Sequence, residues 1–183
     1  STPSWSLSES IVNPVFDANG TYKWRVEASN GYGTPSLSAE RTVLIGDKPS
    51  AVAITGPGDG AYVTENAPTF TWTAEPGSEA PTYAVWVDGT QQVSGLAVTS
   101  WKRGSAYSWN THTGYVVATN GYGSSQSAVV TFHLGTIPGT FSLVTPADGI
   151  KRERTDDVPG TDLTWGESTA SGPDSAPKYE VQI

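Results

Sequence analysis

Residues 22–33 read YKWRVEASNGYG, and this stretch decides the fold. Apolar residues at positions 22, 24, 26 and 28 alternate with Lys23, Arg25 and Glu27. Alternation with a period of two turns one face toward water and the other toward a core, as in a half-buried antiparallel strand. Asn30-Gly31 follows, the pair that most readily adopts positive φ in a hairpin turn. The stretch therefore predicts a strand with one buried face that ends in a tight turn.

The same ending returns in residues 116–123, which read VVATNGYG. Asn30 and Asn120 are 90 residues apart, about the length of one small β-sandwich domain. A chain of 183 residues therefore has room for about two such repeats.

The composition suits short strands joined by turns and disfavours several functions. The chain has 20 glycines and 13 prolines, and only 15% of its residues are charged. Its net charge of −8 disfavours a nucleic-acid binder, which needs a basic face for phosphates, and suits an extracellular surface. Because cysteine is absent, thiol chemistry and cysteine metal sites are excluded. The sequence contains no apolar run of about 18 residues, so no membrane-spanning segment is predicted.

Seven segments between residues 48 and 135 have the composition of strands. Turn signals such as Pro57-Gly-Asp-Gly60 and Asp88-Gly89 separate them. The predicted strands are 51–55, 69–73, 83–88, 91–94, 97–101, 111–120 and 128–134. Seven strands at this spacing predict a sandwich of two antiparallel sheets.

Parts of this pattern recur on both sides of the middle set. Upstream, strands are predicted at 22–30 and 39–45. Downstream, PADG at 146–149, LTW at 163–165 and YEV at 179–181 match PGDG at 57–60, FTW at 70–72 and YAV at 83–85. Asp47-Lys-Pro49 and Thr136-Ile-Pro-Gly139 are predicted linkers, because proline ends strand pairing.

These residues resemble fibronectin type III repeats of the bacterial extracellular type. The resemblance rests on Trp72 and Trp165, on Tyr83 and Tyr179, and on the run at 22–33. It implies an all-β chain of tandem immunoglobulin-like (fibronectin type III) β-sandwiches with seven short antiparallel strands each. On this interpretation residues 1–47 are the C-terminal half of one repeat, 48–135 a complete repeat and 136–183 the N-terminal half of another.

One pair of positions departs from the family pattern. At the shift of 90 residues, Tyr22 corresponds to His112 and Trp24 to Gly114. The family expects a tyrosine whose hydroxyl braces the corner, followed by a large core residue. A missing large side chain costs about 3–5 kcal/mol, so we expect Trp101 or Trp109 to be buried under Gly114.

The sequence offers little for catalysis or metal binding. His112 and His133 lie in predicted strands without motif partners, and a hydrogen-bonded structural histidine is the expected reading for both. We therefore predict that the chain is not an enzyme and has no cofactor.

One loop region contains four aspartates whose carboxylates suit calcium: Asp148, Asp156, Asp157 and Asp162. Nearby Lys151, Arg152 and Arg154 favour a solvated charged loop instead, and no metal site is predicted.

Two aromatic residues are predicted to form an exposed face. If Tyr83, Val85 and Val87 point inward, the period of two turns Trp86 outward. On the neighbouring strand the same argument turns Tyr115 outward. An exposed aromatic patch indicates a contact surface, for sugar rings or for a neighbouring chain. The alternative is that the chain's own loops cover these two rings.

Tyr32 and Tyr122 occupy the tips of the two Asn-Gly-Tyr-Gly turns, where contacts are expected. Because the two turns are identical, a repeated structural role such as abutting the next domain is favoured.

Asn19-Gly-Thr21 is a sequon-like triplet, which makes Asn19 a candidate glycosylation site.

Two functions remain open from the sequence. The favoured one is a non-catalytic spacer in an extracellular repeat protein, such as a cell-surface protein, adhesion fibre or envelope assembly, with neighbouring repeats or other subunits as partners. The alternative is an accessory or glycan-binding module of a secreted polysaccharide-active enzyme. The two half-repeats together make about one domain, so head-to-tail self-assembly by strand complementation is a further hypothesis. The favoured alternative is that the chain continues on both sides of these residues and completes each half-repeat itself.

Overall fold

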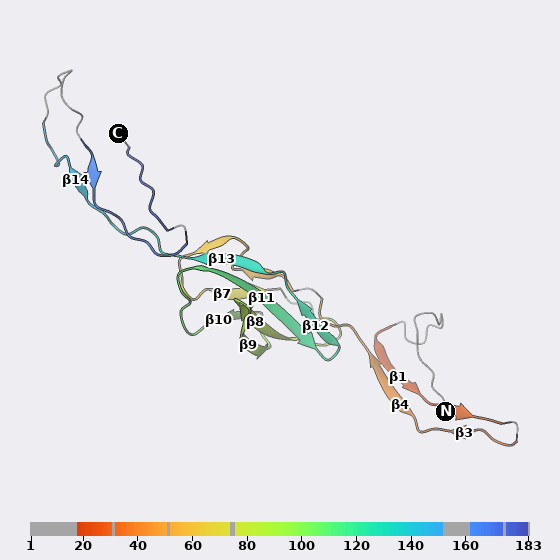
Figure 1. Cartoon of the computed structure of the whole chain (residues 1–183). Coiled ribbons are helices and arrows are strands. Elements are labelled where there is room, and N and C mark those ends of the chain that lie inside the picture. The colour runs from red at the N-terminus through yellow and green to blue at the C-terminus, as the bar shows by residue number, and fades with distance from the viewer. Residues whose placement is uncertain are drawn as a thin grey trace.

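The computed structural model of the chain describes residues 18–30, 32–50, 52–73, 76–151, 162–173 and 175–182. All regular elements in these ranges are β-strands, and they follow one another along an elongated molecule (Figure 1). None of the described residues forms a helix that is long and apolar enough to cross a membrane. The predicted all-β class is therefore confirmed.

Two facing sheets form the central sandwich. The small sheet has the order β10-β7-β5, and the large sheet has the order β6-β13-β11-β8-β9, with β12 paired to β11. The small sheet is built from β5 (Ile54–Gly56), β7 (Thr69–Trp72) and β10 (Ser100–Lys102). The large sheet is built from β6 (Ala61–Val63), β8 (Thr82–Val87), β9 (Thr90–Leu96), β11 (Thr111–Asn120), β12 (Gly123–Gln126) and β13 (Val130–Leu134). This strand order is that of an immunoglobulin-like, fibronectin type III-like sandwich, as the sequence predicted.

The core lies between these two sheets. Along β8 and β11 buried residues alternate with exposed or half-buried ones, so each strand sends every second side chain inward. Apart from Pro49 in the linker, the largest side chains that are fully buried come from both sheets: Phe70, Phe132, Leu134, Val85, Val87 and Val116. The expected alternation therefore matches the packing.

The first strand of the sandwich changes sheets at residues 57–60. β5 pairs antiparallel with β7 in the small sheet, whereas β6 pairs parallel with β13 in the large one. Asp59 holds the crossing loop, because its carboxylate accepts the Thr131 N–H at 2.8 Å. Gly60 has a φ of 72°, which suits glycine. The sequence predicted this loop but not β6, whose three residues pair only with a strand far along the chain.

Phe70 fills the space beside Gly114. A Cβ atom on Gly114 would lie 2.7 Å from Cε1 of Phe70, which comes from the facing sheet. Trp101 and Trp109 are only half-buried, and the Trp101 ring packs behind Phe70 at 6.4 Å between centroids. The expectation that one of these tryptophans lies under Gly114 was wrong, because a residue on the opposite sheet reaches the site directly.

The strands before the sandwich form two short antiparallel pairs. β1 (Gly20–Trp24) pairs with β4 (Arg41–Ile45), and β2 (Glu27–Ala28) pairs with β3 (Ser36–Leu37). The predicted strand 22–30 is therefore divided at residues 25–26. We call the described residues 18–46 the head segment.

The strands after the sandwich form one antiparallel pair. β14 (Leu143–Thr145) pairs with β15 (Thr164–Trp165). Residues 179–181, which match part of β8, lie close to this pair but are not in a strand. We call the described residues from 140 to 182 the tail segment. The division of the chain into 1–47, 48–135 and 136–183 remains a prediction.

Candidate interaction surfaces

Trp86 and Tyr115 lie side by side on the outer face of the large sheet. They are register partners on β8 and β11, and their rings stack with centroids 5.7 Å apart and planes 9° from parallel. Both rings are half-buried, because each covers part of the other. The predicted adjacency is present, while the predicted binding role remains a hypothesis.

A second aromatic pair lies on the same outer face and was missed by the sequence reasoning. Tyr62 on β6 stacks on His133 of β13 at 4.7 Å between centroids, and Tyr62 is 70% exposed. The Thr111 hydroxyl lies 2.8 Å from Nδ1 of His133 and orients the ring. The sequence did not indicate this pair, because the pairing of β6 with β13 cannot be read from local sequence.

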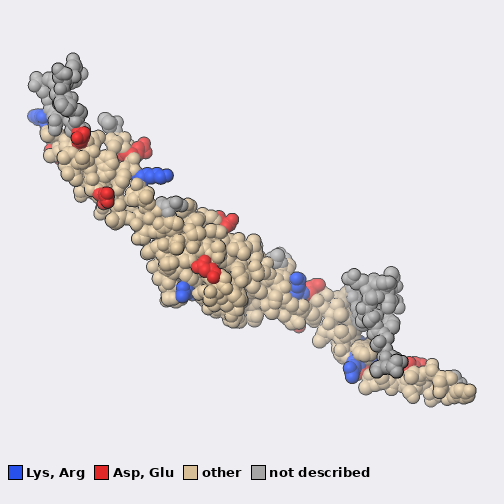
Figure 2. All heavy atoms as spheres, in the orientation of Figure 1, with Lys and Arg blue, Asp and Glu red and all other residues tan. Residues whose placement is uncertain are grey.

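Charged side chains are sparse on the surface that Figure 2 shows. Figure 2 shows lysine, arginine, aspartate and glutamate side chains scattered singly over the visible surface, without a patch of one sign.

Asn120 fastens the linker that enters the sandwich. Its side-chain Nδ2 donates to the Asp47 carbonyl at 3.0 Å, and its Oδ1 accepts the Tyr122 N–H at 2.9 Å. The Asp47 carbonyl also accepts the Ser78 N–H at 3.1 Å, and the Ser78 hydroxyl accepts the Asp47 N–H at 2.7 Å. One asparagine therefore shapes its own turn and holds a residue 73 positions away.

Tyr122 packs its ring on Gly46. A Cβ atom on Gly46 would lie 2.4 Å from Cζ of Tyr122, so a larger residue at that position would displace the tyrosine ring. Ser125 completes the attachment, because its hydroxyl donates to the Pro49 carbonyl at 2.5 Å. The turn of the middle repeat thus holds the linker that precedes its own sandwich.

The matching turn in the head segment has no such neighbour among the described residues. The Asn30 Oδ1 accepts the Tyr32 N–H at 3.0 Å, so the local turn is the same. Tyr32 is nevertheless 93% exposed. The structure therefore separates the two predicted loop-tip contacts: Tyr122 is engaged and Tyr32 is open.

Asn19, the candidate glycosylation site, is exposed and hydrogen-bonded. Its side-chain nitrogen donates to the carboxylate of Asp47 in the linker. That nitrogen is the atom to which an N-linked sugar would be attached. Glycosylation of Asn19, which remains a hypothesis, would compete with this contact.

His112 takes the place of the expected corner tyrosine. In the head segment the Tyr22 hydroxyl donates to the carbonyl of Ala18, four residues upstream, at 2.8 Å. In the sandwich Nε2 of His112 donates to the carbonyl of Ser108, also four residues upstream, at 2.9 Å. His112 is only 6% exposed, and its Nδ1 lies 2.7 Å from Oδ2 of Asp88. Both histidine nitrogens are satisfied, as expected for a structural role.

Asp88 is held from two sides. Its Oδ1 accepts the Thr113 N–H at 2.9 Å, in addition to the contact with His112. Burial by itself would raise the pKa of Asp88, but the hydrogen bonds from His112 and Thr113 lower it on balance. Asp88 also has a φ of 51° in the Asp88-Gly89 turn, as a type I′ hairpin requires.

The described residues contain no group of three or more histidine, aspartate or glutamate side chains that could hold a metal ion. Asp156 and Asp157, two of the four aspartates considered for calcium, lie outside the described residues. His133 stacks on Tyr62 and is hydrogen-bonded to the Thr111 hydroxyl.

Compared with protein-family models and with curated proteins, the chain matches none. Among solved structures it is similar to fibronectin(III)-like modules of Clostridium thermocellum CbhA, with 22% sequence identity and a TM-score of 0.38 over 64% of this chain. It is also similar to the N-terminal four Ig domains of Dscam1 isoform 6.9, with 17% identity and a TM-score of 0.39 over 66% of this chain. The chain spans less than two thirds of each structure, 62% and 28% respectively.

Proposed function

We propose that this chain is a non-catalytic spacer segment of an extracellular repeat protein, in which consecutive repeats are held at a fixed spacing and make protein–protein contacts. The observation that supports this role is the fastened linker at residues 46–49. A spacer keeps its neighbours at a fixed distance only if the junctions between its repeats resist bending. Short linkers that are bonded to an adjoining domain give semi-rigid arrays.

The junction is fastened by several contacts of different kinds. Asn120 and Ser78 bind the backbone of Asp47, the Tyr122 ring covers Gly46, and Ser125 binds Pro49. Each bond by itself contributes only about 1 kcal/mol. Together they hold Gly46, Asp47 and Pro49 against the sandwich.

The second linker is fastened in a related way. The Thr136 N–H donates to the Ser171 carbonyl at 2.8 Å, and the Thr136 hydroxyl accepts the Ser171 N–H at 2.8 Å. The Gly139 N–H donates to the Thr169 carbonyl at 2.9 Å. Two linkers with the same Gly-x-x-Pro pattern, both bonded along their length, favour spacing as the function.

Single-molecule energy transfer tests the proposed rigidity. Because the chain has no cysteine, dyes can be placed on Ser36→Cys and Thr90→Cys, one on each side of the first linker. We expect one narrow distance distribution, and a broader one when Tyr122→Ala is added. The matched control is Tyr32→Ala, which should leave the distribution unchanged. A broad distribution in the parent chain would contradict the spacer role.

A glycan-binding accessory module is the second candidate. It is favoured by the stacked Trp86–Tyr115 and Tyr62–His133 pairs, because aromatic rings on an open sheet face suit sugar rings. A panel of immobilised polysaccharides tests it. Binding that is lost in Trp86→Ala and kept in the exposed control Val129→Ala would favour this function over the spacer.

A further inference from the structure

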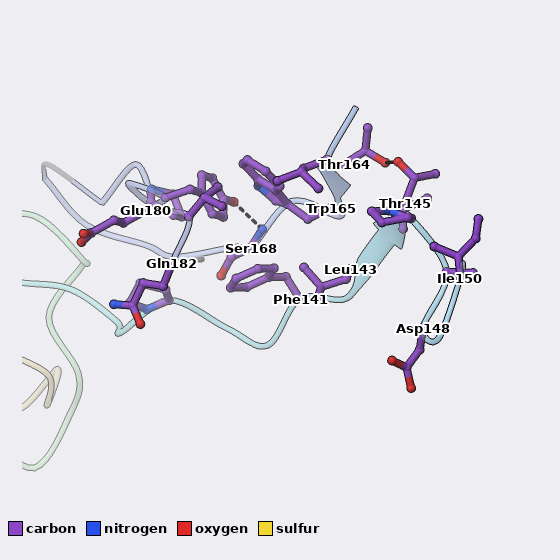
Figure 3. A pocket seen from close by; sticks show the side chains of 18 of the residues that line it. Phe141, Leu143, Thr145, Asp148, Ile150, Thr164, Trp165, Ser168, Glu180 and Gln182 are labelled. Atoms are coloured by element: carbon purple, nitrogen blue, oxygen red, sulfur yellow. Dashed lines mark hydrogen bonds between the residues drawn. The ribbon is translucent and has the colours of Figure 1, made fainter. Parts of the chain in front are cut away.

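Two kinds of aromatic cluster occur in the chain, and only one of them belongs to a core. Trp165 and Tyr179 in the tail segment pack with ring centroids 5.4 Å apart, the same distance as the matching tryptophan and tyrosine in the sandwich core. Figure 3 shows Trp165 beside a cavity of about 850 Å³ in the tail. These rings occupy core positions. Trp86 and Tyr115, in contrast, lie on the side of the large sheet that faces away from the core.

The outer face of the large sheet bears rings and hydroxyl groups. Along β8, β11 and β13, buried residues alternate with more exposed ones, so every second side chain points away from the core. β11 presents five such side chains: Thr111, Thr113, Tyr115, Val117 and Thr119. None of the outward positions on the described strands β6, β8, β11 and β13 is lysine, arginine, aspartate or glutamate.

The matching face of the head segment is charged. At the shift of 90 residues, three charged residues take the places of positions 113, 115 and 117: Lys23, Arg25 and Glu27. Lys23 also forms an ion pair with Glu40 at 2.9 Å. Such charges are usual for a strand face in water. The uncharged face therefore belongs to the middle repeat and is not a requirement of the fold.

The rings on the outer face form two pairs that lie on a diagonal. One pair, Tyr62 and His133, bridges β6 and β13, and the other, Trp86 and Tyr115, bridges β8 and β11. Thr111, the register partner of His133, lies four residues before Tyr115 on β11. A strand rises about 3.3 Å per residue and neighbouring strands lie about 4.8 Å apart, so the centres of the pairs are roughly 16 Å apart.

Threonine hydroxyls lie between the two ring pairs. Thr113 and Thr131 are register partners on β11 and β13, at the midpoint of the diagonal. Thr113 is exposed and Thr131 is half-buried. Because a hydroxyl group both donates and accepts hydrogen bonds, this middle part of the face suits a ligand that does the same.

The Tyr62 end of the diagonal is open and hollowed. Tyr62 is 70% exposed although one face of its ring lies on His133, so the other face is accessible. A hollow of about 210 Å³ adjoins both residues. Its other lining residues, Thr64 and Ser175 among them, are uncharged. This end therefore offers a ring face beside hydroxyl groups.

An uncharged sugar chain has the complementary chemistry. Each pyranose ring has an apolar face of C–H groups, which packs on an aromatic ring, and a rim of hydroxyls, which bond to other hydroxyls. The outward strand positions offer no cation for a carboxylate or a sulfate. The core of a protein–protein interface is largely apolar, whereas Val117 is the only aliphatic side chain among the outward residues of β11. The face thus fits a neutral polysaccharide better than an acidic one or a protein.

We propose that the outer face of the large sheet binds an uncharged, linear polysaccharide that runs diagonally from the Tyr62–His133 pair to the Trp86–Tyr115 pair. Each ring pair packs on one part of the sugar chain, and the hydroxyls of Thr113 lie along the path between them. The inference rests on the glycan-binding candidate, to which it adds a ligand class and a path, and it is independent of the spacer role.

Affinity electrophoresis of the full chain tests the ligand class. Native gels contain hydroxyethyl cellulose, galactomannan or dextran, with polygalacturonate as the charged comparison. We expect at least one neutral polymer to retard the protein and polygalacturonate to leave its mobility unchanged. No retardation by any neutral polymer, or stronger retardation by polygalacturonate, would overturn the inference.

Two variants test whether both ring pairs contact the sugar chain. Tyr62→Ala and Trp86→Ala should each weaken binding of the neutral polymer roughly tenfold. Because Tyr62 is 70% exposed, its replacement leaves the core intact even if Trp86→Ala lowers stability. Tyr32→Ala, which removes a 93% exposed ring outside this face, is the matched control and should bind like the parent. Unchanged binding in Tyr62→Ala would overturn the path across both pairs.

The length of the sugar chain provides the sharpest test. Fragments of the bound polymer are compared by calorimetry, some long enough to span roughly 16 Å and some too short to reach both pairs. Long fragments should bind more tightly than short ones, and Tyr62→Ala should remove that advantage. Equal affinity for both lengths would reject the diagonal path and leave the glycan-binding candidate in place. Energy transfer across the first linker needs no sugar, so it decides the spacer role separately.

Discussion

The two Asn-Gly-Tyr-Gly turns have the same sequence and the same local hydrogen bond, yet their tyrosines have opposite surroundings. Tyr122 lies on Gly46, and Tyr32 stands in the open. The asparagine forms the turn in both cases, because its side chain binds the N–H two residues on. The comparison shows that the Asn-Gly-Tyr-Gly motif determines the shape of the turn. The segment that packs against the turn determines what its tyrosine contacts.

A similar contrast separates the cores of the head segment and the sandwich. Phe70 is fully buried, whereas Trp24 is 46% exposed. Phe70→Ala should lower the free energy of unfolding by about 3–5 kcal/mol, because a large cavity opens beside Gly114. Trp24→Ala should change it by less than about 1 kcal/mol in the monomer. Urea unfolding followed by tryptophan fluorescence measures both, and equal losses would remove the contrast.

The two corners offer a narrower comparison. His112→Phe should cost about 1–3 kcal/mol, because it leaves the Ser108 carbonyl and Asp88 without the ring nitrogens. His112→Tyr restores a donor of the kind that Tyr22 provides and should recover part of the loss. Thermal unfolding of the three proteins measures this order. A more stable Phe variant would show that the hydrogen bond at this corner is dispensable.

Removing each turn tyrosine tests the difference between the turns. Tyr122→Ala should lower the stability of the sandwich by about 1 kcal/mol, because a half-buried ring is lost from Gly46. Tyr32→Ala should have no measurable effect on a monomer. Hydrogen exchange at Asp47, whose N–H is bonded to Ser78, should accelerate only in the first variant. Faster exchange at Asp47 in both variants would show that Tyr32 also makes a contact that stabilises the linker.

The smallest expected effect concerns acid. The pKa of Asp88 is lowered in the folded chain, so its ionised form stabilises the fold above its ordinary value near 3.8. That contribution is lost as the pH falls through the folded pKa. Asp88→Asn should therefore flatten the decline of unfolding free energy below about pH 4, measured by urea titrations at several pH values. An unchanged slope would assign the acid sensitivity to other carboxylates.

Tertiary packing decided several features that local patterns missed. β6 was not predicted, because a segment of three residues is too short to show an alternation of apolar and polar side chains. Only its pairing with β13 makes these residues a strand. The space at Gly114 was assigned to a neighbouring tryptophan, whereas Phe70 of the facing sheet fills it. In each case the deciding contact joins residues far apart in sequence.

The sequence alone determined the fold class, the outward direction of Trp86 and Tyr115, and the bounds of the strand 111–120. These features follow from a period of two and from turn chemistry, which act over a few residues. Only the tertiary structure decided that Tyr122 holds a linker, that Tyr62 pairs with His133, and that Asp88 completes the histidine corner. Those pairings depend on how the sheets and linkers meet, and no local pattern encodes that geometry.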